Sequence, residues 1–469
     1  MFCQLDRLRR CLSPRIRQAL DELPETLDET YERTLLDIDD ENWAYAHRLF
    51  QCLVVARFPL RVDELAEFLA FKSEAGGNLT FDGNWRPENA RDTVLSTCSS
   101  LIAIVNVYGL PLIQFSHFSV KEYLTSSRIA EGGRVSRYYI PLEPAHLFVA
   151  QACLSFLLQL DRHVTKTSIG GFPLAWYASR YWTDHAEFWD VSSHTEDLIK
   201  CLLNPENHHF ANWVWIFDTI LDLSSAHSER PCPTGTSAPL HYAAYHGFHR
   251  VAEWLITTCS QRVNVSSRRD SMNPLHFSSE RGQFMVAEVL LTHHADANAR
   301  DEYDRTPLHF ASLYGHSKVV RLLLEHGADV DSKNNYGETP LFFLSESNGN
   351  LEIAQVLLDY GADPNIWTKL GQNLLHMTLQ YGYQGLTLLL LKYGADPNVR
   401  DGASRTLLHV SSRRGDSKVA QALLALGVDV NSRDNRGRTP LQEANDPDHW
   451  NPESAEQVAQ VLLKHGATI

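Results

Sequence analysis

The chain has 469 residues, more than one hydrophobic core usually serves, so two or more folding units are expected. Its formal net charge of -15 disfavours binding to phosphate backbones and anionic membrane surfaces. The eight cysteines are scattered without a CxxC pair, which indicates neither a zinc site nor a disulfide framework. No apolar signal segment follows the N-terminus, and no stretch approaches the roughly 18 apolar residues of a membrane span, so we expect an intracellular protein.

The chain begins with segments of helical spacing. Residues 1–41 contain two such pieces, separated by Pro24. Apolar periodicity predicts two more short helices at residues 44–56 and 62–70. Glycines at positions 76, 77 and 83 then indicate a loop.

A third helix and a hairpin follow this loop. The helix is predicted at residues 87–101, with Pro87 at its first position and an apolar stripe along one side. Two β-rich runs, LIAIVNV and LPLIQFSH, meet at Tyr108-Gly109, which predicts a β-hairpin. Three helices followed by a hairpin is the order of a winged helix, which we expect at residues 42–130.

Three further helical stretches lead toward the C-terminal half. They are LEPAHLFVAQACLSFLLQL, FPLAWYASRYWTDHAEFW and NHHFANWVWIFDTILDL, and they predict a helical connecting region at residues 131–224. Residues 225–236 are rich in serine, proline and glycine and are expected to form a linker.

From residue 237 to residue 469 one pattern recurs seven times. Its copies are APLHYAAYHG, NPLHFSSERG, TPLHFASLYG, TPLFFLSESNG, NLLHMTLQYG, TLLHVSSRRG and TPLQEAND. The position of Pro239 recurs at spacings of 35, 33, 33, 34, 33 and 33 residues. This period, with the signature T-P-L-H-x-A nearly complete from Thr306 to Ala311, is typical of ankyrin repeats. We therefore expect a mostly α-helical protein whose C-terminal half is an ankyrin-repeat α-solenoid of about seven repeats.

The recurring residues have mechanical reasons. Proline fixes φ near the helical value and lacks an N–H that the first helical turn would leave unpaired, so it favours the start of an inner helix. The threonine before it, as in Thr306, Thr339 and Thr439, is expected to cap that helix.

A histidine also recurs at one site of the inner helix, at positions His241, His276, His309, His376 and His409. Each lies one stacking step from the next. We therefore interpret these rings as bridges between backbone groups of adjacent turns, and not as metal ligands.

Two glycines twelve residues apart recur in four repeats. The first is expected to end the inner helix and the second the outer helix, because glycine adopts the left-handed C-cap conformation without penalty. His294 and Cys259 occupy the second position in the first two repeats, so we expect strained or rearranged C-caps there. Extra residues are expected to disturb the fourth inner helix, near Ser347, and the last repeat.

The candidate binding surface comprises the hairpin tips and the exposed side of the inner helices, which line the concave face of this architecture. Exposed Tyr, Trp and Arg side chains most often carry the binding energy of protein interfaces. At the tips these candidates are Arg269, Tyr303, Tyr336 and Trp367. On the inner helices they are Tyr245, Arg281, Tyr314, Tyr381 and Arg414. The alternative for each is an ordinary surface residue that covers its own hairpin.

The N-terminal half resembles a known family. The segments CQLDRLRRCLSPRIRQALDELPETLDETYERTLLDI, HRLFQCLVVARFPLRVDELAEFLAF, and VLSTCSSLIAIV with IQFSHFSVKEYLTS are similar to the stretch after the NTPase core in fungal NACHT–ankyrin proteins, relatives of nucleotide-binding immune receptors. The resemblance covers residues 1–224 and, through the repeats, nearly the whole chain. It implies a post-NACHT helical segment at 1–41, a winged helix of the GPI inositol-deacylase type without deacylase activity at 42–130, and a connecting helical region after it.

The chain departs from this family at the nucleotide site. The NTPase needs a G-x-x-x-x-G-K-[ST] loop, and no Gly-Lys pair occurs in the sequence. We therefore expect no cofactor. Two interpretations stay open: a fragment of a signal-transducing NACHT ATPase, or a shortened relative that keeps only the regulatory and recognition parts.

Other classes of function fit the sequence less well. A DNA-binding winged helix needs a surplus of positive charge, but the presumed recognition helix places Arg91 against Glu88 and Asp92. The motifs G-x-S-x-G and H-E-x-x-H are absent, so no catalytic or metal-binding residues are expected. We expect a non-catalytic scaffold in the cytoplasm, with the nucleus as a second possibility. It would bind another protein on its concave ankyrin face as the sensor part of an NLR-like signalling protein.

Overall fold

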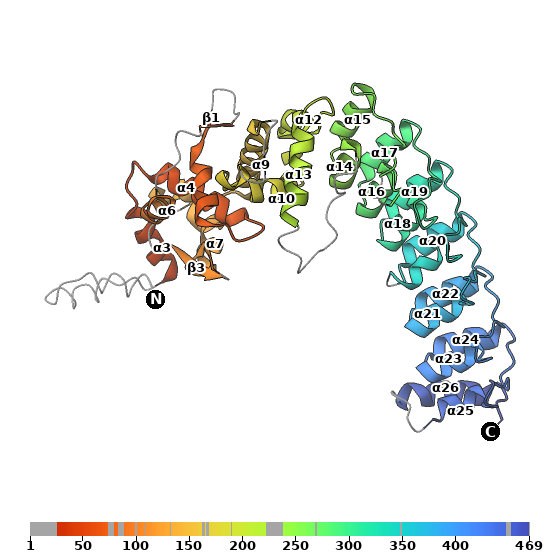
Figure 1. Cartoon of the computed structure of the whole chain (residues 1–469). Helices are drawn as coiled ribbons and strands as arrows, with labels where there is room; N and C mark the ends of the chain where they lie inside the picture. The colour runs from red at the N-terminus through yellow and green to blue at the C-terminus, as the bar shows by residue number, and fades with distance from the viewer. Residues whose placement is uncertain are drawn as a thin grey trace. The chain divides into compact units, whose positions relative to one another are not determined.

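The computed structural model describes residues 26–73, 79–82, 89–98, 101–107, 109–131, 133–161, 165, 168–188, 190–221, 238–267, 270–347, 349–446 and 452–468. Helices dominate, as expected from the sequence. The chain divides into two compact units, Met1–Gly235 and Thr236–Ile469, which are described separately below (Figure 1).

The N-terminal unit opens with helices and two small hairpins. In chain order its first elements are α3 (Leu27–Leu36), α4 (Trp43–Val55), α5 (Val62–Glu67), η2 (Phe68–Ala70), β1 (Phe71–Ser73), β2 (Leu79–Phe81), α6 (Ala90–Cys98), β3 (Ile102–Val107) and β4 (Leu110–Phe115). Strands β3 and β4 pair antiparallel, and Gly109 turns between them with φ of 84°. The expected order of three helices and a hairpin is therefore present in α4, α5, α6 and β3–β4.

The segment just before α5 adds a third strand-like edge to this hairpin. Arg61 forms an antiparallel bridge with Leu112 of β4, and the N–H of Ile113 donates to the carbonyl of Leu60 at 2.8 Å. The Arg61 N–H also donates to the carboxylate of Glu64 at 2.8 Å, which caps the start of α5. Chain segments on both sides of α5 and α6 are thus joined through one sheet.

In this region the described part of one predicted helix is shorter than expected, and a hairpin is present that was not predicted. Helix α6 begins at Ala90 and ends at Cys98, with the side chain of Asn89 accepting from the Asp92 N–H at 3.2 Å; Pro87 lies outside the described residues. Strands β1 and β2 lie before and after the first two glycines of the expected loop, and they form a hairpin in which Phe71 pairs with Phe81. Strands of three residues are too short for a periodicity signal, so the sequence did not show them.

A helical region completes the unit. Its elements are α7 (Phe118–Leu124), α8 (Ser127–Ala130), η5 (Gly133–Tyr138), α9 (Leu142–Gln159), η6 (Ile169–Gly171), α10 (Ala175–Ala186), α11 (Val191–His194), α12 (Glu196–Leu203) and α13 (His209–Leu221). The expected linker at 225–236 and residues 1–25 lie outside the described residues.

The prediction that no stretch is long and apolar enough for a membrane span was wrong for the segment that contains helix α9. The segment Gly133–Gln159 meets that test by length and composition. In the structure, however, α9 packs against α10, α4 and α12, and side chains such as Val149, Cys153 and Phe156 are buried. It is the core helix of the N-terminal unit, and its apolar character follows from contacts with helices around it.

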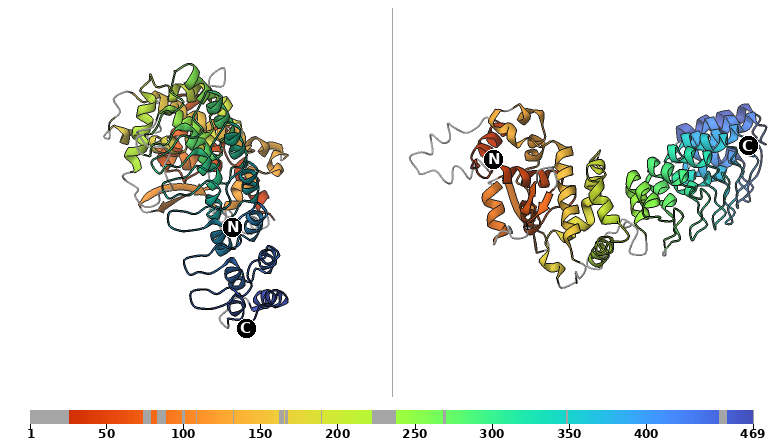
Figure 2. Two further views of the ribbon diagram at one scale, coloured as in Figure 1. Left: turned by 90° about the vertical axis from the view of Figure 1, so that its right-hand side faces the viewer. Right: turned by 90° about the horizontal axis from the view of Figure 1, so that it is seen from above.

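The C-terminal unit is a stack of helix pairs. The inner members are α14 (Pro239–His246), α16 (Pro274–Arg281), α18 (Pro307–Leu313), η7 (Phe342–Ser345), α21 (Leu374–Tyr381), α23 (Leu407–Arg414) and α25 (Pro440–Ala444). The outer members are α15 (His249–Thr257), α17 (Phe284–Thr292), α19 (Ser317–Glu325), α20 (Leu351–Asp359), α22 (Gln384–Lys392), α24 (Ser417–Ala425) and α26 (Pro452–Lys464). Loops that connect one pair to the next extend in a row from one side of the helices (Figure 2).

Proline and glycine define the helix ends as the sequence predicted. The inner helices α14, α16, α18 and α25 begin at the recurring proline. Gly282 ends α16 in the left-handed conformation with φ of 70°, and Gly327 follows α19 with φ of 82°. His294 takes the same conformation with φ of 63°, whereas in the first repeat it is Ser260, with φ of 52°, and not Cys259. The second repeat therefore has the expected strained C-cap, at His294. In the first repeat the left-handed residue lies one position later than expected, at Ser260.

Two local expectations for the inner helices need correction. The fourth inner element is a 3-10 helix, η7, and not an α-helix, although the hydroxyl of Thr339 still accepts from the backbone N–H of Phe342, at 3.4 Å. The hydroxyl of Thr306 bonds the Nδ1 atom of His309 at 2.9 Å, and not a backbone N–H. Thr439 does accept from the backbone N–H of Gln442, at 3.4 Å, as predicted.

The core of this unit consists of aliphatic side chains that adjacent helices share. Leu308 of α18, Leu290 of α17 and Leu323 of α19 are fully buried. Burial of one such leucine stabilises the fold by roughly 1.5–3 kcal/mol. Because each pair packs mainly on its neighbours in the stack, this burial requires several repeats.

Candidate partner-binding face

The loop before each inner helix forms a hairpin tip that an acidic or amide side chain holds in shape. In the third repeat, Oδ1 of Asp301 accepts from the N–H groups of Tyr303 and Arg305, at 2.9 and 2.7 Å. Asn334 accepts in the same way from Tyr336 and Glu338, both at 2.9 Å. These bonds fix the backbone of each tip, so the side chains of Tyr303 and Tyr336 project from rigid turns.

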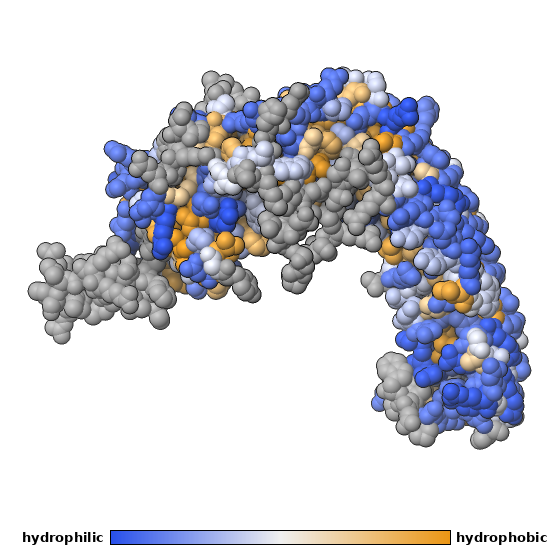
Figure 3. All heavy atoms as spheres, viewed as in Figure 1, coloured by the Kyte–Doolittle hydropathy of each residue, from blue (hydrophilic) through white to orange (hydrophobic). Residues whose placement is uncertain are grey.

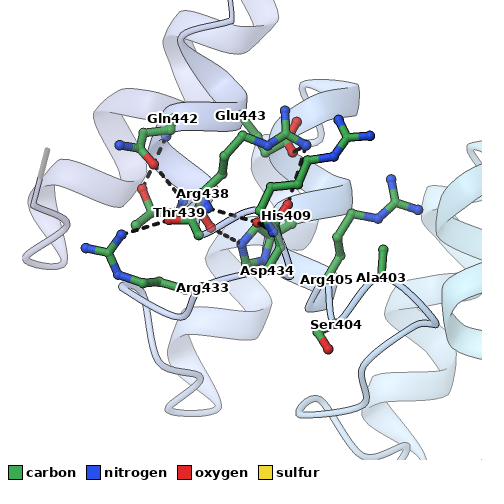
Figure 4. Close-up of polar contacts among 12 residues, drawn as sticks. Ala403, Ser404, Arg405, His409, Arg433, Asp434, Arg438, Thr439, Gln442 and Glu443 are labelled. Atoms are coloured by element: carbon green, nitrogen blue, oxygen red, sulfur yellow. Dashed lines mark hydrogen bonds and ion pairs between the residues drawn. The ribbon is translucent and has the colours of Figure 1, made fainter.

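Arginine supplements the carboxylate in three of these tips. Arg305 pairs with Asp301 at 2.7 Å, and Arg405 pairs with Asp401 at the same distance. In the last tip, Arg438 lies between Asp434 and Glu443, with N–O distances of 3.4 and 2.5 Å (Figure 4). Because both carboxylates are almost fully buried, the guanidinium offsets the cost of their desolvation.

We did not single out these pairs from the sequence, although a signal was present. The spacing Asp-x-x-x-Arg recurs as DEYDR, DGASR and DNRGR at equivalent positions of three repeats. Arg305 also stacks on two rings, with its guanidinium carbon 5.0 Å from the Tyr303 centroid and 4.5 Å from the Phe310 centroid. It therefore orients one of the predicted contact residues.

The repeated histidines bridge successive repeats, which confirms the interpretation made from their spacing. In all five, Nε2 donates to a carbonyl oxygen in the hairpin of the following repeat at 2.9–3.2 Å. Burial lowers the pKa of His276 and of His309 to about 4, so both rings are neutral at pH 7. Their Nδ1 atoms then accept from the N-cap residue, as in the bond from the Thr306 N–H to His309 at 3.0 Å.

The predicted tip residues lie on neighbouring tips that are joined through the backbone. The N–H of Asn335 donates to the carbonyl of Tyr303 at 2.9 Å, and the N–H of Lys369 donates to that of Tyr336 at 2.8 Å. The side chains of Tyr303, Tyr336 and Trp367 are 43%, 50% and 44% exposed. Three consecutive tips thus each expose an aromatic side chain, Tyr303 and Tyr336 at equivalent positions and Trp367 three residues before the equivalent position of its tip. The fourth predicted tip residue, Arg269, lies outside the described residues.

The predicted inner-helix residues form a second row. Tyr245, Arg281, Tyr314, Tyr381 and Arg414 all lie at or next to the C-terminal end of an inner helix. The inner helix begins at its tip, so its eight residues separate the two rows by about 12 Å. We call the tips, these helix ends and the helix surface between them the inner face.

Members of the second row differ in their freedom to contact a partner. The guanidinium of Arg281 lies 4.8 Å from the centroid of the half-buried Tyr245 ring, so the structure brings these two together. Arg414 donates to the carbonyl of Gln380 at 2.6 Å. Tyr314 and Tyr381 are 47% and 53% exposed.

The surface around these residues is mainly polar. Figure 3 shows the C-terminal unit from one side as a hydrophilic surface with separate small apolar patches. A protein interface on such a surface depends on a few anchoring side chains within a polar surround. No group of three or more His, Cys, Asp or Glu side chains is placed to hold a metal ion, as far as the described residues show.

Comparison with known proteins matches the geometry of this stack. Family models described as ankyrin repeats match residues 191–301, 240–334, 293–368, 327–401 and 388–444, which together span more than half of the chain. The chain is an ankyrin-repeat protein. The first of these ankyrin matches begins at residue 191, upstream of the first repeat expected from the sequence.

A curated relative and two solved structures share parts of this ankyrin-repeat protein. The azaphilone pigments biosynthesis cluster protein L of Monascus ruber is 31% identical over 296 residues, which cover 59% of this chain and 61% of the relative. The chain thus spans about three fifths of the length of that relative. The ankyrin repeat domain of Bcl-3, a member of the IkappaB protein family, is 23% identical, covers 47% of this chain and 98% of its own, and gives a TM-score of 0.41. The ankyrin repeat domain of human ASB11 is 24% identical, covers 50% of this chain and 100% of its own, and gives a TM-score of 0.42.

Proposed function

We propose that this ankyrin-repeat protein is a non-catalytic scaffold and that its inner face binds another protein. Ankyrin stacks serve as extended surfaces for protein–protein contact. One observation carries the proposal: Tyr303, Tyr336 and Trp367 are exposed on three consecutive tips that backbone bonds join. Aromatic side chains fixed in this way lose little conformational entropy on binding, so they suit the role of anchors.

The N-terminal unit is proposed to be the regulatory part of an NLR-like protein, with a winged helix at residues 42–130. In support, the isolated bridge between Arg61 and Leu112 joins the segment before α5 to the β3–β4 hairpin, a connection that a winged helix also makes. The proposal includes both open interpretations, a shortened relative and a fragment of a NACHT ATPase.

Protein packing, and not DNA binding, is the role proposed for this module. Helix α6 carries Arg91 next to Asp92, so its charges cancel where phosphate contacts would be needed. The hairpin exposes apolar side chains at its end: Val105, Val107 and Leu110 are 37%, 38% and 50% exposed. An apolar hairpin end fits a contact with another protein surface better than a contact with a phosphate backbone.

An intracellular location is proposed on the chemistry of the thiols. Among the described residues, Cys52, Cys153 and Cys201 are free thiols. Burial raises the pKa of Cys52 and of Cys153, so both stay protonated and inert. Free thiols without disulfides are typical of a reducing compartment.

The test is affinity capture with a variant of the tip row. Wild-type chain and the triple variant Tyr303→Ala/Tyr336→Ala/Trp367→Ala are immobilised and exposed to an extract of the producing organism, and bound proteins are quantified by mass spectrometry. We expect proteins captured by the wild type to be lost from the triple variant, because each anchor contributes more than about 1 kcal/mol. The melting curve should stay unchanged, since the three side chains are exposed.

A matched control removes three exposed side chains from the outer helices. Tyr360, Leu426 and Leu463 are 46%, 52% and 51% exposed, and they lie at or near the ends of α20, α24 and α26. The variant Tyr360→Ala/Leu426→Ala/Leu463→Ala should capture the same proteins as the wild type. Equal capture by wild type and tip variant would contradict the proposed use of the inner face.

A further inference from the structure

The junction between the fifth and sixth repeats differs from its neighbours. At the other junctions a tip N–H donates to the preceding tip, as from Asn335 to Tyr303 at 2.9 Å and from Asn435 to Ala403 at 3.0 Å. The equivalent bond, from the Gly402 N–H to the Leu370 carbonyl, is not formed in the described stretch 349–446. The Leu370 side chain is 73% exposed. The row of joined tips is therefore open at this point.

A cavity of about 380 Å³ lies at this opening. Its walls come from the fifth and sixth tips and from helices α21 and α23, so it belongs to the inner face. Met377 and Val410 supply apolar lining, and Gln380 supplies a polar group. Its volume falls within the range of about 300–1,000 Å³ that is usual for ligand pockets.

Three arginines line this cavity, but they are not equally engaged. Arg405 forms a two-bond pair with Asp401, with Nε and Nη2 at 2.8 and 2.7 Å from one carboxylate oxygen, so the two charges cancel. Arg414 has its Nε 3.6 Å from Asp416 and donates through Nη1 to a backbone carbonyl. Arg413 is exposed and makes no hydrogen bond or ion pair with any described residue. The cavity thus holds a surplus of positive charge in a chain whose net charge is -15.

One buried polar atom of the cavity wall is also without a partner. His376 lines the cavity and is 6% exposed, and its Nε2 donates to the carbonyl of Arg405 at 3.2 Å. Its Nδ1 has no hydrogen-bond partner among the described residues. In the third repeat, Nδ1 of His309 accepts from the backbone N–H of Thr306. In the fifth repeat, the side-chain amide of Asn373 donates to the carbonyl of Ile366 at 3.3 Å. This atom is buried and is a hydrogen-bond acceptor, as a carboxylate is, so the ligand preference of the cavity follows from its arginines and not from His376.

We propose that this cavity is a specific pocket for a carboxylate-bearing side chain, Asp or Glu, of the partner polypeptide, bound through the guanidinium groups of Arg413 and Arg414. This inference rests on the proposed function, in which a protein binds the inner face. Arginine recognises carboxylates through paired, charge-assisted hydrogen bonds. Trp367 and Leu370 stand exposed on the fifth tip, so apolar residues beside the acidic one would find contacts there.

The test is selection of peptides from a random display library by the immobilised full-length chain. The wild type should enrich sequences in which an Asp or Glu adjoins apolar residues. The variant Arg413→Glu reverses the free charge, and Met377→Trp fills the cavity without a change of charge. The control Arg321→Glu makes the same charge change on helix α19, at an exposed residue of an outer helix.

The affinity of one selected peptide is then measured by fluorescence polarisation. Arg413→Glu and Met377→Trp should each weaken its binding by about 10-fold, and Arg321→Glu should leave it unchanged. Replacement of the acidic residue of the peptide by Gln or Asn should weaken binding to the wild type by a similar factor, and should not weaken binding to Arg413→Glu further. Unchanged circular dichroism spectra show that the variants are folded.

The possible failures are distinguishable. Selected peptides without an acidic preference, or acidic peptides that bind Arg413→Glu and Met377→Trp as tightly as the wild type, overturn the pocket and leave the proposed function standing. No enrichment of any peptide by the wild type, together with equal capture of proteins by the wild type and the tip-row variant, overturns both.

Discussion

At the scale of single residues, the glycine that ends an inner helix and the glycine that follows an outer helix are required for different reasons. Gly282 adopts a left-handed conformation with φ of 70°, and a Cβ at this position would collide with the His316 ring of the next repeat. Gly327 has φ of 82°, but a Cβ there would meet nothing. The first glycine is therefore required by its conformation and by the close approach of a neighbour, and the second by its conformation alone.

This difference predicts the stability of two alanine variants. Gly327→Ala should lower the free energy of unfolding by about 1–2 kcal/mol, the cost of a left-handed alanine. Gly282→Ala should lower it by more, because the His316 ring must also move. Chemical denaturation measures both values. Addition of His316→Ala should recover the extra loss in Gly282→Ala and recover nothing in Gly327→Ala; equal losses in the two single variants would contradict the role of the close approach.

The bridging histidines predict a dependence of stability on pH. The pKa of His276 and of His309 is lowered by burial to about 4 in the folded state, below the ordinary value of 6.5 that applies when the chain is unfolded. Between these values the unfolded chain binds more protons, so the free energy of unfolding is highest above pH 6.5 and falls as the pH drops toward 4. Each ring should account for about 2 kcal/mol of this loss at pH 5.

Urea denaturation of residues 236–469 at pH 7 and pH 5 measures this effect. The variant His276→Gln/His309→Gln carries no proton at either site, so its stability should fall less over the same interval. The same pH dependence in the variant and the wild type would show that other groups cause it.

At the scale of elements, each hairpin tip depends on one side chain that caps its own turn. Asp434 accepts from the N–H groups of Arg436 and Arg438, both at 2.8 Å, and its second oxygen faces the Arg438 guanidinium. The fourth repeat has Asn334 in this role without an ion pair. The two backbone hydrogen bonds are thus common to both tips, and the tip of the seventh repeat has an ion pair in addition.

We therefore expect two substitutions of Asp434 to differ in severity. Asp434→Asn keeps the acceptor oxygen and leaves Arg438 paired with Glu443, so it should cost less than the alanine substitution. Asp434→Ala leaves two N–H groups without their acceptor and should cost about 1–3 kcal/mol. Thermal unfolding ranks the two. An alanine variant as stable as the asparagine variant would contradict the capping role.

The elements that the sequence predicted best are those with local causes. The starts of α14, α16 and α18 follow from the conformation of one proline, and the C-cap at Gly282 follows from the freedom of one glycine. The histidine bridges were predictable because their spacing equals the stacking period. The Asp-x-x-x-Arg pairs could have been found in the same way.

Other features depend on contacts that no local pattern records. The short hairpin of Phe71 with Phe81 forms through tertiary packing, and the fourth inner element becomes a 3-10 helix although its sequence still begins with Thr339-Pro340-Leu341. At the candidate site, the sequence indicated exposed aromatic side chains on the tips. It did not indicate the open junction beside Leu370, because a missing bond between repeats leaves no trace in the residues themselves.

At the scale of the whole molecule, the N-terminal unit also contains buried groups whose protonation affects stability in acid. The N-terminal unit buries a chain of hydrogen bonds in which His146 lies 2.9 Å from His185, and burial lowers the pKa of these rings to about 4 and about 3. Burial also raises the pKa of Glu64 in this unit to about 7, so protonation of Glu64 stabilises the fold as the pH falls and opposes the histidines. Protonation of Glu64 should therefore reduce the loss of stability that the two histidines cause on acidification of this unit.

The two units also divide the proposed roles. The C-terminal unit offers the inner face, with its row of tips and its positively charged pocket. The N-terminal unit offers an apolar hairpin end at Val107 and Leu110, suited to contact with another protein. Both surfaces would serve association with other proteins.

Hydrogen–deuterium exchange on the chain, free and bound to a protein captured by the wild type, tests the central claim most directly. Binding to the inner face should slow exchange at the tips, residues 301–305, 334–338 and 368–372, and in helices α18, α21 and α23. The outer helices α19, α22 and α24 should change less. Slowed exchange confined to the outer helices or to the N-terminal unit would contradict the account.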